Sequence, residues 1–105
     1  MDDLAEFWVH STTVRTHEGS GPFGETYADP VPVPCFIDHR RQLVRDTQGR
    51  EVTSEATITG PVEHGHRFTP ESLTTVGGRE RTVITLAIRE SGDLDLPDHF
   101  EATTT

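Results

Sequence analysis

The sequence predicts an all-β domain, a small antiparallel β-barrel or sandwich of five to six strands, with long loops and at most one short N-terminal helical turn. Two observations lead to this fold class. Short runs of alternating apolar and polar residues recur along the chain, and turns rich in glycine and proline separate them. A helical signature occurs only near the start, where Asp3 and Glu6 have the spacing of a capping box.

Length and charge limit what such a domain does. The 105 residues correspond to one domain, 1–105, and the apolar fraction of 31% indicates a thin core that gains stability from neighbours. Eighteen acidic and nine basic residues give a net charge of -9. A sequence-reading nucleic-acid binder needs clustered positive charge, so that class is excluded, whereas a protein past which DNA slides is not. Without an apolar run of about 18 residues or a basic leader, we expect no membrane contact and an intracellular or particle-bound protein.

The first third of the chain contains an aromatic start, a strand and a long loop. Phe7 and Trp8 either close one end of a barrel or anchor a partner. Residues 9–18 are rich in Thr, Val and His and predict the first strand. Residues 19–34 hold three glycines and four prolines, which predicts an extended loop or edge segment, and loops of this length tend to be functional. Candidate contact residues in this loop are Gly19, Gly21, Phe23, Gly24, Glu25 and Tyr27.

The middle of the chain, residues 34–58, predicts a β-hairpin. Residues 46–49 are expected to form its turn, with Gly49 supplying a positive φ. Folding the arms together places Ile37 opposite Ile58 and Leu43 opposite Val52 on an apolar face, and a one-residue slip would expose that face. The single cysteine, Cys35, lies in the apolar part of this hairpin and is expected to be a small buried hydrophobe.

A second polar loop and a second hairpin follow. Gly60-Pro61 ends the strand, and residues 62–71 form the loop, with Glu63, His64, His66 and Arg67 as candidate contact residues. Residues 72–76 and 82–89 predict the second hairpin, joined through residues 77–80, with 82–89 as a central strand. Residues 100–103 predict a last short strand.

The sequence has no convincing catalytic or metal-binding constellation. His64 and His66 form a His-x-His pair, but a zinc site needs three or four converging ligands and the cysteine is distant. A nucleophile triad is not indicated either, since no Gly-x-Ser-x-Gly motif is present. We therefore expect no enzyme activity, no bound metal and no cofactor.

The basic residues Arg40, Arg41 and Arg45 form a cluster that has two interpretations. Arg40 lies opposite Glu55 in the predicted hairpin, so that a cross-strand ion pair is expected. Alternatively, the three arginines contact the acidic face of a neighbouring identical subunit. Head-to-tail contacts of that kind generate rings when the rotation closes.

The order of five segments resembles that of small head-tail connector proteins of long-tailed bacteriophages, especially those of actinobacterial hosts. The segments are MDDLAEFWVHSTTV, PVPVPCFID, RRQLVRDTQGREVTSEATI, GGRERTVITLAI and LPDHFEA. The resemblance covers nearly the whole chain and is one of pattern and order, without a single diagnostic motif. Among neck proteins the adaptor is mostly helical and the tail terminator is a larger sheet-plus-helix protein, whereas the head-closure protein, or stopper, is a small β-barrel. The stopper is the best match.

The resemblance implies a ring, commonly of twelve copies, in the virion neck between the adaptor on the portal side and the tail terminator, assembled in the host cytoplasm. One loop of each subunit in that family projects into the DNA channel and helps to retain the genome. We assign this role to residues 19–34, with 63–71 as second choice, and the sequence leaves that choice open. The alternatives are another head-tail junction protein (adaptor or tail-completion component), a small metal-binding β-domain, or a general interaction domain.

Overall fold

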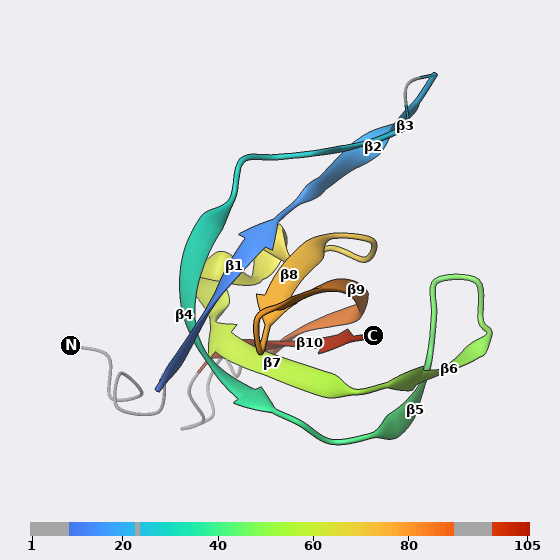
Figure 1. Cartoon of the computed structure of the whole chain (residues 1–105). Coiled ribbons are helices and arrows are strands. Elements are labelled where there is room, and N and C mark those ends of the chain that lie inside the picture. The colour runs from blue at the N-terminus through green and yellow to red at the C-terminus, as the bar shows by residue number, and fades with distance from the viewer. Residues whose placement is uncertain (1–8, 23, 90–97) are drawn as a thin grey trace.

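A closed barrel of six antiparallel strands forms the body of the molecule, in the order β1-β4-β7-β10-β9-β8 (Figure 1). The computed structural model describes residues 9–22, 24–89 and 98–105. The barrel strands are β1 (His10–Arg15), β4 (Val31–Asp38), β7 (Ala56–Pro61), β8 (Leu73–Val76), β9 (Arg79–Arg89) and β10 (His99–Thr104). The predicted small all-β barrel is confirmed.

The interior of the barrel is filled by alternate residues of its strands, as the period of two requires. Ile58 pairs with Ala102, and both are fully buried, whereas the neighbouring Thr57 and Thr59 are only half-buried. Cys35 is buried as expected, and burial raises the pKa of its thiol to about 11. The core cluster consists of Val14, Val33, Cys35, Ala56, Ile58, Phe68, Val76, Val83, Phe100 and Ala102.

A short 3-10 helix, η2 (Val62–Arg67), packs against β7, β9 and β10 at one end of the barrel. Directly after it, the ring of Phe68 stacks on the ring of Phe100 with centroids 4.6 Å apart. Gly65 permits the close approach, because a Cβ there would lie 3.1 Å from Cβ of Phe100. The prediction of a polar loop over residues 62–71 was therefore wrong for 62–67, which are helical. The helical turn expected at the N-terminus lies outside the described residues.

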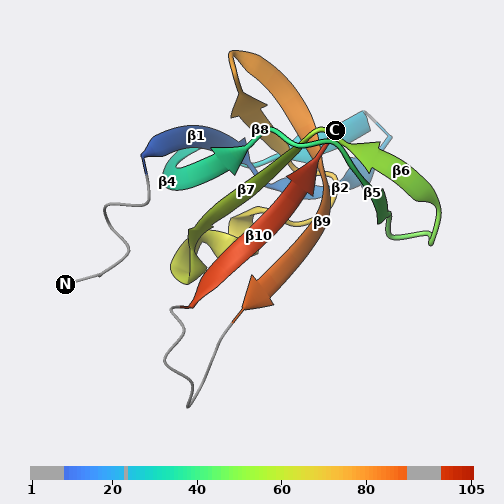
Figure 2. The same ribbon diagram turned by 90° about the horizontal axis from the view of Figure 1, so that it is seen from below.

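Two hairpin arms extend from the barrel toward the same side (Figures 1 and 2). One arm pairs β2 (His17–Gly21) with β3 (Gly24–Tyr27), and the other pairs β5 (Gln42–Arg45) with β6 (Glu51–Ser54). The strand predicted over residues 9–18 thus divides into β1 and β2. Much of the loop predicted over 19–34 is also strand, because the turn signal around Pro22 folds it into a hairpin.

Prolines 32 and 34, expected to confine this segment to a loop or an edge, lie within β4. Residues 31–35 of β4 pair with β1, and residues 36–38 pair with β7. The prolines occupy the part of the strand that pairs with β1, and both rings are exposed. Residues 31–35 pair with β1 only, so this part of β4 has an unpaired edge on its other side. A proline whose missing N–H would point to that edge removes no ladder hydrogen bond.

The predicted register of the central hairpin is confirmed near the barrel and wrong in the arm. Ile37 faces Ile58, as predicted, but Val44 instead of Leu43 faces Val52. The cause is a three-residue turn: Gly49 adopts φ 81°, its N–H donates to the Asp46 carbonyl at 3.0 Å, and the Asp46 N–H donates to the Arg50 carbonyl at 2.9 Å. The prediction placed all of residues 46–49 in the turn, which pairs Arg45 with Arg50. In the structure Asp46 bonds to Arg50 across residues 47–49, so the pairing is shifted by one.

The second hairpin forms as predicted, with a tighter turn. Val76 faces Arg79 across Gly77 and Gly78, whose φ values of 61° and 78° suit a two-residue hairpin turn. β9 lies between β8 and β10, so the expected central position is confirmed. The β9–β10 ladder has a register shift at which Thr103 faces Thr85 and Thr104 faces Val83. The bulge leaves Ile84 between the two pairs.

Candidate functional site in the β2–β3 arm

The β2–β3 arm contains the loop residues that the sequence singled out. Gly21, Gly24 and Glu25 are exposed, and Gly19 and Tyr27 are half-buried; Phe23 lies outside the described residues. Gly19 and Gly24 have φ values of 148° and 102°, in a region that side-chain-bearing residues rarely adopt. A Cβ at either position would meet no atom within 4 Å, so backbone conformation alone requires glycine there.

The root of the arm is held by an aromatic cluster. The rings of His17 and Tyr27, which face each other in the ladder, are 5.6 Å apart in an edge-on arrangement. The guanidinium of Arg15 lies 5.5 Å from the centre of the Tyr27 ring, a cation–π distance. The Ala28 N–H also donates to the Thr16 carbonyl at 2.8 Å. These contacts fix where the arm leaves β1.

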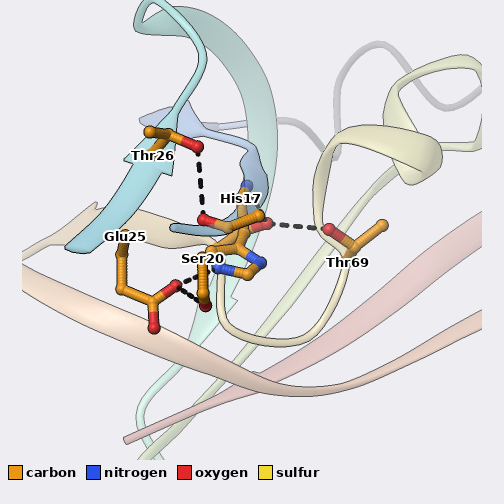
Figure 3. Close-up of polar contacts among 7 residues, drawn as sticks. His17, Ser20, Glu25, Thr26 and Thr69 are labelled. Carbon is orange, nitrogen blue, oxygen red and sulfur yellow. Dashed lines mark hydrogen bonds and ion pairs between the residues drawn. The ribbon is translucent and has the colours of Figure 1, made fainter. Parts of the chain in front are cut away.

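Further along the arm, a polar cluster joins its two strands (Figure 3). Both His17 Nε2 and Ser20 Oγ bond to the same carboxylate oxygen, Oε2 of Glu25, with Ser20 donating at 2.7 Å. The hydrogen bond from Ser20, followed by that of His17, lowers the pKa of Glu25. Thr26 Oγ1 donates to the Gly19 carbonyl at 3.2 Å, beside the bulge between His17 and Gly19.

Hydroxyl groups connect the arm to the loop between η2 and β8. The His17 N–H donates to Ser72 Oγ at 2.9 Å, and Ser72 Oγ bonds in turn to Thr69 Oγ1 at 2.9 Å. Thr16 Oγ1 donates to the Arg67 carbonyl at 2.8 Å. The beginning of β2 is thus fastened to the barrel, while the exposed tip extends beyond these contacts.

The cluster of His17, Ser20 and Glu25 has the residue types of a catalytic triad without its geometry. In a triad the histidine accepts the proton of the serine, whereas here His17 and Ser20 contact one oxygen of Glu25. A carboxylate with a lowered pKa is also a poor general base. The arrangement is suited to holding β2 and β3 together.

The second-choice loop has a different position. Its residues Glu63, His64, His66 and Arg67 lie on η2, which packs on the barrel end and does not project as the arm does. Glu63 and His66 are exposed, and His64 Nδ1 is enclosed without a hydrogen-bond partner. Within the part of the chain that the structure describes, no group of three or more His, Cys, Asp and Glu side chains is placed to hold a metal ion.

The arginine cluster lies on β5 and on the two residues before it, and each arginine pairs with a nearby carboxylate. Arg41, and not Arg40 as predicted, reaches Glu55, at 3.2 Å. The one-residue register shift explains the change of partner, because it places Glu55 opposite Arg41 instead of Arg40. Arg40 contacts Asp38 at 3.5 Å and Arg45 contacts Glu51 at 3.8 Å. Phe7 and Trp8, the other predicted contact residues, lie outside the described residues.

Sequence reasoning did not single out His17 or Ser20 as contact residues of the arm. The signal was available, since Gly21-Pro22 and Gly24 form a turn signature, and pairing the flanking residues around it brings Ser20 opposite Glu25. It was overlooked because the four prolines directed attention to an extended loop or edge and not to a hairpin.

Comparison with known proteins adds no relative. No protein-family model matches the sequence, and no curated protein matches it. Within residues 9–22, 24–89 and 98–105, the structure contains no helix with the length and hydrophobicity needed to cross a bilayer.

Proposed function

We propose that the chain is a structural protein of the bacteriophage neck. In this proposal it is a head-to-tail stopper, forms a ring between the adaptor and the tail terminator, and lines the channel through which packaged double-stranded DNA leaves. The observation that carries the proposal is the architecture: a closed six-stranded barrel from which an exposed hairpin arm extends.

The β2–β3 arm is the channel element of this proposal. Its tip is exposed, and its contacts to the barrel are concentrated at the root. The alternative segment, η2, is packed on the barrel end, which supports the first choice. A two-stranded ribbon is only marginally stable alone, so an arm fastened at one end can change its angle.

Charge supports passage of DNA without adhesion. The arm carries Glu18 and Glu25 and no arginine or lysine, and the whole chain has a net charge of -9. Because the DNA backbone is also negative, such a surface repels it and offers no sticking points. Retention of the genome then rests on steric closure by the arms.

Shortening the arm tests this function. In the phage that carries the gene, residues 19–26 are replaced by Asn-Gly, which joins Glu18 to Tyr27 through a tight turn. We expect particles to assemble and then lose their DNA, measured as the ratio of filled to empty heads. The control, Ser20→Ala, keeps the arm at full length and should retain DNA. Shortened-arm particles that hold their genomes like wild type would rule out the arm as the barrier.

A further inference from the structure

A groove of about 170 Å³ lies outside the barrel, where the β5–β6 arm approaches β9. Apolar lining comes from Val52 on the arm and from Ile84 on β9, next to the core residue Val83, and Asp46 and Glu71 also line the groove. In both views the arm lies on the side of the barrel where β10 ends (Figures 1 and 2). Small-molecule sites usually measure about 300–1,000 Å³, so this groove has room for one side chain and little more.

Two departures from regular structure build the groove. The bulge in β9 excludes Ile84 from the core cluster, and yet Ile84 is only 8% exposed because the arm lies over this part of the strand. The register of the arm puts Val44 and Val52 on its half-buried face. Glu71 has φ 79°, unusual for a residue other than glycine, while its N–H donates to the Val83 carbonyl at 2.9 Å. The backbone of Glu71 is therefore held beside β9.

The opposite face of the same arm carries an apolar knob between two cations. Leu43 is 69% exposed, the largest value among the exposed large hydrophobic residues of the described chain. Arg41 and Arg45 are two positions away on either side, and alternation puts them on the face of Leu43. Their ion pairs, Arg41–Glu55 and Arg45–Glu51, are exposed, and such pairs are weak enough to exchange partners.

We propose that Leu43 of one copy of this chain docks in the groove of the next copy, with Arg41 and Arg45 facing the carboxylates of Asp46 and Glu71. The apolar side chain meets a mainly apolar lining, and the two cations approach two anions, of which Asp46 already pairs with Arg50 at 3.1 Å and would be shared with it. Hydrogen bonds from the backbone of Arg50 and Gln48 lower the pKa of Asp46, so this carboxylate stays ionised near neutral pH.

The contact is head-to-tail, since knob and groove lie on opposite faces of one arm. Each copy presents Leu43 to one neighbour and receives a second neighbour in its groove, which yields a ring when the rotation closes. This inference deepens the proposed function, and it rests on that function for the closure of the ring. The partner is a second copy of the chain, and the β5–β6 arm is the connecting element.

Sedimentation velocity over a concentration series of the purified full chain tests the contact. Leu43→Asp removes the knob, and Glu71→Arg gives the groove a positive charge that repels Arg41 and Arg45. Both positions are exposed, so folding should be preserved. We expect the wild type to assemble and each variant to associate roughly 30-fold more weakly, as when an interface hot spot is lost. The control is Val9→Asp, which places the same charge at a residue that is 66% exposed and should assemble like wild type.

Mixing the two variants gives the sharper test. Leu43→Asp keeps an intact groove and Glu71→Arg keeps an intact knob, so an equimolar mixture should form a 1:1 dimer that does not grow. A wild type that stays monomeric, a Leu43→Asp variant that assembles like wild type, or a mixture without dimers would overturn the inference. None of these outcomes affects the DNA-retention test of the β2–β3 arm, so the two proposals fail separately.

Discussion

Gly60 of β7 offers the most direct test of the barrel packing. A Cβ at this position would lie 2.6 Å and 2.9 Å from Cε1 and Cζ of Phe100, and 3.2 Å from the Pro34 carbonyl oxygen. Real Cβ atoms essentially never approach so closely, and Phe100 has little freedom to move because it is fully buried and stacked on Phe68. Gly60→Ala therefore overpacks the core.

The expected loss of stability follows from two opposing terms. Overpacking a core costs about 1–3 kcal/mol, and alanine regains about 0.5–1 kcal/mol over glycine in a strand. The middle of the two ranges gives a net loss of about 1 kcal/mol, which lowers Tm by roughly 4–8 °C for a domain of this size. Urea unfolding at constant m-value measures it directly.

The matched control is Gly21→Ala in the exposed arm. Gly21 has nothing within 4 Å of the added Cβ and is not among the positive-φ glycines, so alanine should leave stability within about 0.5 kcal/mol of wild type. If Gly60→Ala proved as stable as Gly21→Ala, the close packing of Phe100 on β7 would be wrong.

Two further predictions concern the arms. Ser20 and His17 lower the pKa of Glu25, so the ionised carboxylate stabilises the β2–β3 arm above pH about 4.5, and this contribution is lost as the pH falls through the lowered folded-state pKa. The protection of the arm's amides, measured as exchange relative to the intrinsic rate at the same pH, should therefore fall on acidification, and Glu25→Gln should remove most of that pH dependence. Gly49 adopts φ 81°, so Gly49→Ala should destabilise the β5–β6 turn by about 1–2 kcal/mol, whereas Gly49→Asn should cost less. Amide exchange rates of the β5–β6 arm that equal those of wild type in the alanine variant would contradict the three-residue turn.

The sequence alone determined the local structure of this protein to a large extent. Alternation and turn chemistry predicted strands at most of the observed positions, the pairing of Ile37 with Ile58, the Gly77-Gly78 hairpin and the last strand near Phe100. These features depend on residues close in the chain or on a simple in-out pattern, so a linear reading recovers them.

Tertiary structure decided what a linear pattern leaves ambiguous. Closure of the turn between Asp46 and Arg50 shifted the arm register, which left Leu43 exposed and placed Val52 on the groove side. Phe100 held residues 62–67 on the barrel end, although their polar composition is typical of an open loop. The bulge that sets Ile84 apart from the core depends on β10 and the arm together. In each case the local sequence allows several conformations, and packing against segments distant in the chain selects one of them. Neighbouring residues alone therefore do not predict the outcome.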